Sequence, residues 1–169
     1  LEKRIADLKD GYRQNVAIIG DEAVGKTSLI SRLIGKFCDN RILILYMEIR
    51  PESLRIFVKR FIAVLLYNFL INSDIPLKED LDFLLKTAER YIPKTVAAAK
   101  ALLAGLEKRR RANVFSELLA LCDIIHDETG KFCVVVFDEF TLLEKVGIND
   151  LYAEWSKLLV SRKNTLYII

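Results

Sequence analysis

The segment from Gly20 to Ser28 (G-D-E-A-V-G-K-T-S) constrains the possible folds of this chain more than any other. It matches the pattern G-x-x-x-x-G-K-[ST] at every fixed position. Before it, residues 15–19 (N-V-A-I-I) are typical of a short buried strand, and after it the apolar residues of 29–34 (L-I-S-R-L-I) recur at helical spacing. The pattern has meaning only between a strand and a helix, so this context favours a phosphate-binding loop over a chance glycine turn.

The chemistry of such a loop follows from its geometry. Glycines let the backbone bend around a phosphate, and the amides and the helix N-terminus supply positive potential. The Lys26 ammonium can reach the β- and γ-phosphates, and the Thr27 hydroxyl can ligate Mg²⁺. The side chains of Asp21 and Glu22 are expected to face solvent, away from the phosphates. We therefore predict a nucleoside triphosphate site formed by Gly20, Asp21, Glu22, Ala23, Val24, Gly25, Lys26, Thr27 and Ser28.

Length and composition favour one globular domain over residues 1–169. The chain has 169 residues, enough for a sizeable core, and its 52% apolar content fits buried parallel strands. In the most apolar stretch, 54–71, only 61–71 is free of charge, which is short of the roughly 20 residues that cross a bilayer. Nothing at the start resembles a signal peptide, so we expect no membrane segment and a cytoplasmic protein. The net charge of +3 is too small to argue for nucleic acid.

The chain alternates helical and strand patterns. Expected strands are 15–19, 41–49, 131–137 and 165–169, and expected helices are 1–9, 52–71, 78–91, 94–111, 113–126 and 149–160. Asn113, and Asn149 or Asp150, are expected to cap the last two helices. Alternation of this kind predicts an α/β fold with a parallel sheet and right-handed crossovers. The cysteines Cys38, Cys122 and Cys133 lack metal-site spacing and are expected to be reduced thiols.

A second informative segment is 132–140 (F-C-V-V-V-F-D-E-F), an apolar strand that ends in two carboxylates. The carboxyl end of this strand is expected to face the same crevice as the phosphate loop. Asp138 can then hold the Mg²⁺ shell through water, and Glu139 can orient or deprotonate an attacking water. A core strand with an acidic exit would give the same pattern. The joint presence of Lys26 and Thr27 favours the catalytic interpretation.

These two motifs, with the opening L-E-K-R-I-A-D-L-K-D, resemble the ATPase domain of the archaeal-type ATPases, in the AAA+ and STAND branches of the P-loop NTPases. The resemblance covers nearly the whole chain. It implies a three-layer α/β/α domain with the strand order typical of AAA+ proteins and a helical insertion, about 52–127, before the Walker B strand. It also implies ATP and Mg²⁺ as cofactors, with Thr27 and Asp138 at the metal and Lys26 and Glu139 as catalytic residues.

The resemblance has gaps. The family's glycine-arginine step before the opening helix is missing, and the sensor residue, fifth strand, lid helices and arginine finger would lie beyond Ile169, so we expect a truncated ATPase core. The helical region 52–126 is the expected contact for a partner protein or a second copy, because the nucleotide chemistry does not use it. DNA binding follows from the family association alone. The basic run 108–111 is more typical of a solvated helix end.

Two other functions stay open. Residues 16–32 also resemble the start of a Ras-like small GTPase, which should carry a D-x-x-G switch at a strand end and N-K-x-D at the guanine. The D-x-x-G at 127–130 follows an amphipathic segment and is more typical of a helix-terminating turn, and no N-K-x-D occurs. A nucleotide-operated switch or scaffold with slow hydrolysis is the second alternative. Glu48 ends the second expected strand. We interpret it as a simple strand exit, in preference to a polar switch near Glu139.

Overall fold

The structure is a computed structural model, and it describes residues 1–21, 24–37, 39–71, 77–78, 80–108, 113–148 and 151–169. Its sheet contains β1 (Ile42–Glu48), β2 (Phe132–Asp138) and β3 (Thr165–Ile168), in the spatial order β1-β2-β3. Both pairings are parallel, and Glu48 of β1 lies opposite Asp138 of β2. The prediction of an α/β fold with a parallel sheet is confirmed.

The predicted first strand, 15–19, is reduced to a single bridge at the free edge of β3. Val16 pairs in parallel with Ile168, and the Val16 amide donates to the Tyr167 carbonyl at 2.9 Å. The Ile18 amide donates to the Ile169 carbonyl at 2.6 Å. These contacts place the segment beside β3 with one parallel bridge.

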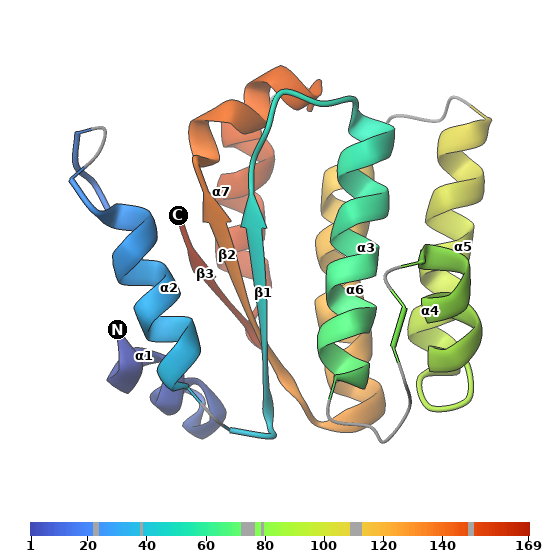
Figure 1. The fold of residues 1–169 in the computed structure, drawn as a ribbon, viewed down its shortest axis with the longest axis horizontal. Coiled ribbons are helices and arrows are strands. Elements are labelled where there is room, and N and C mark those ends of the chain that lie inside the picture. The colour runs from blue at the N-terminus through green and yellow to red at the C-terminus, as the bar shows by residue number, and fades with distance from the viewer. Residues whose placement is uncertain (22–23, 38, 72–76, 79, 109–112, 149–150) are drawn as a thin grey trace.

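Helices cover both faces of the sheet (Figure 1). The helical elements are α1 (Glu2–Asp7), η1 (Leu8–Asp10), α2 (Lys26–Lys36), α3 (Leu54–Leu70), α4 (Leu81–Ala88), α5 (Pro93–Glu107), α6 (Val114–Thr129), η2 (Phe140–Val146) and α7 (Leu151–Ser161). α1 and α2 lie on one face, and α3, α6 and α7 on the other, with α4 and α5 as an outer layer against α3 and α6. The four helices α3 to α6 fall between β1 and β2 in the chain.

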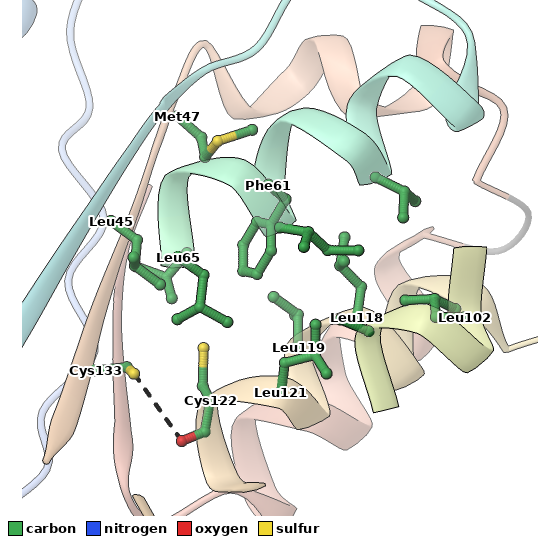
Figure 2. Close-up of a cluster of buried hydrophobic side chains, with 14 of the residues drawn as sticks. Leu45, Met47, Phe61, Leu65, Leu102, Leu118, Leu119, Leu121, Cys122 and Cys133 are labelled. Carbon is green, nitrogen blue, oxygen red and sulfur yellow. Dashed lines mark hydrogen bonds between the residues drawn. The ribbon is translucent and has the colours of Figure 1, made fainter. Parts of the chain in front are cut away.

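The larger core lies between the sheet and the α3–α6 layer. Strand residues alternate between the faces, so Leu45, Met47 and Cys133 point toward α3 and α6, while Val134 and Val136 face α1 and α2. Figure 2 shows side chains of β1, α3 and α6 converging around Phe61, Cys122 and Cys133. α3 is apolar almost all round because the sheet covers one side and the outer helices cover the other.

Several predicted helix ends are corrected. Asn113 precedes α6 as expected, but its side chain makes no capping hydrogen bond and its backbone is left-handed, with φ of 62°. α4 is shorter than 78–91, and α6 continues to Thr129 before Gly130 ends it in a left-handed conformation. The 3₁₀ helix η2 was not expected. The cap at 149–150 and the basic residues 109–111 lie outside the described residues.

None of the described helices combines the length and the apolar character that a bilayer crossing requires.

Candidate functional site

The phosphate-loop motif connects the edge of the sheet to the first turn of α2. Gly25 precedes α2 with φ of 93°, a conformation that a residue with a Cβ rarely adopts. At Gly20 an added Cβ would lie 3.0 Å from Cγ2 of Val24, so the loop is also tight there. The Asp21 residue is exposed, as predicted. Glu22 and Ala23 lie outside the described residues.

Lys26 reaches back across this loop. Its Nζ donates to the carbonyl oxygens of Gly20 and Asp21, each at 2.7 Å. An ammonium group has three donors and prefers charged acceptors, so these neutral carbonyls occupy donors that a phosphate oxygen would bind more strongly. The loop therefore holds a cation at its centre. Ser28, on the same first turn of α2, is exposed.

Asp138 joins the second motif to the first. Its residue is 5% exposed at the end of β2, and its Oδ2 accepts a hydrogen bond from the Thr27 hydroxyl at 2.8 Å. Its Oδ1 accepts from the Glu139 amide at 3.1 Å. The structure thus brings together the two residues that the sequence assigned to a metal, although 111 positions separate them.

Glu139 directly follows this carboxylate in an unusual backbone conformation. Its φ of 58° and ψ of 43° are left-handed, which costs a non-glycine residue about 1–2 kcal/mol. The residue is exposed, and it lines a cavity of about 480 Å³ at the carboxyl ends of the strands. The other lining residues are Ala17, Ile18, Ile19, Gly20, Lys26, Ile30, Phe137, Asp138, Phe140, Thr141, Tyr152 and Ile169. Lys26 and Glu139 therefore face one crevice.

Tyr46 is a site residue that the sequence analysis missed. It lies on β1, and its hydroxyl donates to Oδ2 of Asp138 at 2.8 Å, the same oxygen that Thr27 contacts. Burial, and then the hydrogen bond to Asp138, raise the pKa of Tyr46 to about 12, so the phenol keeps its proton at neutral pH. The available signal was a polar-tipped aromatic near the end of a strand, but its partner depends on which strand lies alongside.

Glu48 makes a different contact from the one that a polar switch would require. It is exposed and forms an ion pair with Arg50 at 2.5 Å. This local pair fits the interpretation of Glu48 as a strand exit. Arg50 is itself exposed, and the Glu48 carboxylate raises the pKa of its guanidinium.

An aromatic cluster packs against the end of β2 on the face of the sheet that α3 and α6 cover. Phe137 lies 6.0–6.5 Å from the rings of Phe57, Phe61, Phe115, Phe140 and Trp155. The Trp155 residue is 6% exposed and belongs to the core. Because Phe140 directly follows Glu139 and its ring centroid lies 4.9 Å from that of Trp155, the chain's single tryptophan can report on changes at the site.

The remaining sequence candidates lie away from the crevice. Residues 127–129 form the last turn of α6 and Gly130 ends it, as predicted for a helix-terminating turn. Cys122 and Cys133 are buried free thiols, and the neighbouring Cys122 together with burial raises the pKa of the Cys133 thiol. Cys38 lies outside the described residues, and Lys108 is exposed at the end of α5.

The oxygen atoms around Asp138 suit a magnesium ion that is also coordinated by phosphates. The Thr27 hydroxyl and the Asp138 carboxylate are oxygen ligands of the kind Mg²⁺ prefers. Within the described part of the chain there is no cluster of three or more His, Cys, Asp or Glu side chains that could form a self-contained metal cage. Mg²⁺ ordinarily binds through one or two protein groups plus substrate phosphates and water, so the residues fit this ion.

Searches of protein-family models, of curated proteins and of solved structures each give no match for this chain.

Proposed function

We propose that this chain is the core of a P-loop ATPase of the AAA+/STAND type, which binds ATP with Mg²⁺ and hydrolyses the bond to the γ-phosphate. The observation that carries the proposal is the 2.8 Å hydrogen bond between the Thr27 hydroxyl and the Asp138 carboxylate. It links the phosphate-loop motif to the acidic strand end, and each motif alone would be far less specific.

The strand order supports the ATPase over a Ras-like GTPase. β3 lies between the 15–19 segment and β2, which agrees with the order that the resemblance to AAA+ proteins implies. At about 4.8 Å per strand, β2 ends about 10 Å from the strand position that enters the loop, which leaves room for a phosphate and a water. The D-x-x-G at 127–130 ends a helix, whereas a GTPase switch requires it at a strand end.

Each proposed role follows from the position of the side chain. When nucleotide binds, the Lys26 ammonium leaves the loop carbonyls and donates to phosphate oxygens. Thr27 and Asp138 provide the oxygen ligands for the metal ion. A magnesium ion held by Thr27 and Asp138 would supply positive charge that neutralises the phosphates. Glu139, exposed on the crevice wall, orients the attacking water and accepts its proton.

Competitive binding of Mg-ATP against Mg-GTP tests the site and the nucleotide together. We expect a preference for ATP and a loss of binding in Lys26→Ala. Lys36→Ala is the matched control, since Lys36 is exposed at the opposite end of the same helix. A preference for GTP would overturn the family assignment. Equal binding by Lys26→Ala and the wild type would refute the phosphate-loop assignment.

Steady-state ATP hydrolysis by the variant Glu139→Gln tests whether Glu139 is the general base. Gln keeps the shape of the side chain but cannot accept the proton, so nucleotide binding should persist while steady-state hydrolysis falls by about 10²-fold or more. Intact turnover would show that another group is the base. If the wild type binds ATP with protection of α3–α6 from hydrogen exchange but negligible turnover, a nucleotide-operated switch replaces the ATPase.

A further inference from the structure

We propose that Tyr46 is a positioning residue of this site, whose hydroxyl holds the Asp138 carboxylate in the orientation that magnesium binding needs. The inference rests on the proposed function and extends it to a residue outside both sequence motifs. The contact that carries it is the 2.8 Å hydrogen bond from Tyr46 to Oδ2 of Asp138.

The carboxylate is held by donors from three separate positions in the chain. Oδ2 accepts from Tyr46 on β1 and from Thr27 on α2, while Oδ1 accepts from the Glu139 amide next in the chain. Rotation about the side-chain bonds of Asp138 would break at least one of these contacts. An oxygen of a carboxylate can accept two hydrogen bonds, so both Oδ2 donors fit at once.

Tyr46 and Thr27 differ in what supports them. Tyr46 lies within the parallel ladder, opposite Val136, and is half-buried against the apolar cluster that faces α1 and α2. Thr27 is exposed on the first turn of α2, directly after the phosphate loop. Tyr46 therefore supplies the donor that belongs to the sheet, and it keeps the carboxylate in place when the loop rearranges around a ligand.

Thr27 and Tyr46 therefore affect magnesium binding in different ways. A hydroxyl has one donor and two acceptor lone pairs, so Thr27 can offer a lone pair to Mg²⁺ while its O–H still donates to Asp138. Tyr46 has no such second task and acts on the metal only through Asp138. Partners of this kind, which orient a ligand without touching the ion, typically change metal affinity by 10–100-fold when removed.

The test is Tyr46→Phe in the full chain, which removes the hydroxyl and keeps the ring. Binding of a fluorescent ATP analogue is titrated with Mg²⁺ and measured again in EDTA. We expect the half-saturating Mg²⁺ concentration to rise about 10-fold, with affinity in EDTA within twofold of wild type. Tyr91→Phe, which removes an exposed hydroxyl after α4, is the control and should behave as wild type.

The alternatives give distinct results. A Mg²⁺ dependence of Tyr46→Phe within twofold of wild type overturns the positioning role. An equal loss of affinity with Mg²⁺ and in EDTA also overturns it, because a purely structural defect has no metal dependence. A wild-type chain that binds no nucleotide at any Mg²⁺ concentration refutes the proposed function itself, and the inference falls with it. A melting curve in EDTA verifies that the variant is folded.

Discussion

Replacing Glu128 with Gln removes a charged cap that one helix supplies to another. Glu128 lies on α6, and its carboxylate accepts hydrogen bonds from the Lys94 amide at 2.7 Å and the Thr95 amide at 2.8 Å. It also accepts from the Thr95 hydroxyl at 2.6 Å, and Thr95 is fully buried. Ile92, at the N-cap position of α5, provides no side-chain cap, so Glu128 takes over that task.

The size of the effect follows from these contacts. Loss of a helix cap costs about 1 kcal/mol, and loss of a negative charge at a helix N-terminus adds about 0.3–1 kcal/mol. Gln keeps one acceptor oxygen but presents an amide N–H to a backbone N–H, so we expect about 1.5 kcal/mol in total. For a chain of this length, that corresponds to a melting temperature about 3–6 °C lower.

The same contacts set the pH dependence. Burial raises the pKa of Glu128, but the hydrogen bonds from Thr95 and from the amides outweigh it, so the folded-state pKa is lowered. A depressed carboxyl pKa contributes stability that is complete above the unfolded value of about 4.3 and is lost as pH falls through the folded value. Below both values the wild-type side chain is a neutral acid, and it then resembles Gln.

Urea unfolding at pH 7 and near pH 3 measures this directly. The stability difference between wild type and Glu128→Gln should be about 1.5 kcal/mol at pH 7 and should be smaller near pH 3, below the unfolded value, because protonation removes the charge. Glu89→Gln is the control: Glu89 is about half exposed in its ion pair with Lys100, so its effect should stay below about 1 kcal/mol. A difference of equal size at both pH values would refute the charged-cap argument.

Three other substitutions have defined outcomes. Tyr167→Phe should leave the melting temperature unchanged or raise it, since the buried Tyr167 hydroxyl has no hydrogen-bond partner among the described residues; a loss above about 1 kcal/mol would contradict this. Phe137→Ala should cost about 3–5 kcal/mol in urea unfolding, because it empties the centre of the aromatic cluster; a cost below 2 kcal/mol would mean that the cluster closes the gap. Gly25→Ala should lower stability by about 1–2 kcal/mol through its positive φ, and an unchanged melting curve would argue against that backbone conformation.

Local signals were sufficient for most of the elements. The apolar runs that became β1 and β2 were predicted to within one residue at each end, because a fully buried parallel strand has a continuous apolar sequence. α3 was predicted nearly to its bounds, since Pro51 excludes an earlier start and the Ser53 side chain caps the first turn. The phosphate-loop motif is local too, and Gly25 has the left-handed backbone that the motif's glycine permits.

The missed features depend on local alternatives or on distant parts of the chain. Asn113 suits both a side-chain cap and a left-handed backbone, and it adopts the second. The run 140–146 has apolar residues at nearly helical spacing, and it forms the 3₁₀ helix η2 after the left-handed Glu139. Tyr46 and Glu128 act on residues 92 and 33–34 positions away. No pattern within β1 or α6 specifies such partners.

The contacts of Lys26 determine what kind of ligand can open the loop. Its ammonium donates to two loop carbonyls, and each such bond is worth about 1.5–3 kcal/mol. A neutral ligand offers nothing stronger in exchange, whereas an anionic phosphate oxygen pairs with the ammonium in a shorter and stronger hydrogen bond. On the proposed function, the loop is therefore closed by its own lysine until a highly charged anion arrives. Affinity should consequently increase from the mono- to the di- to the triphosphate, and this order should disappear in Lys26→Ala.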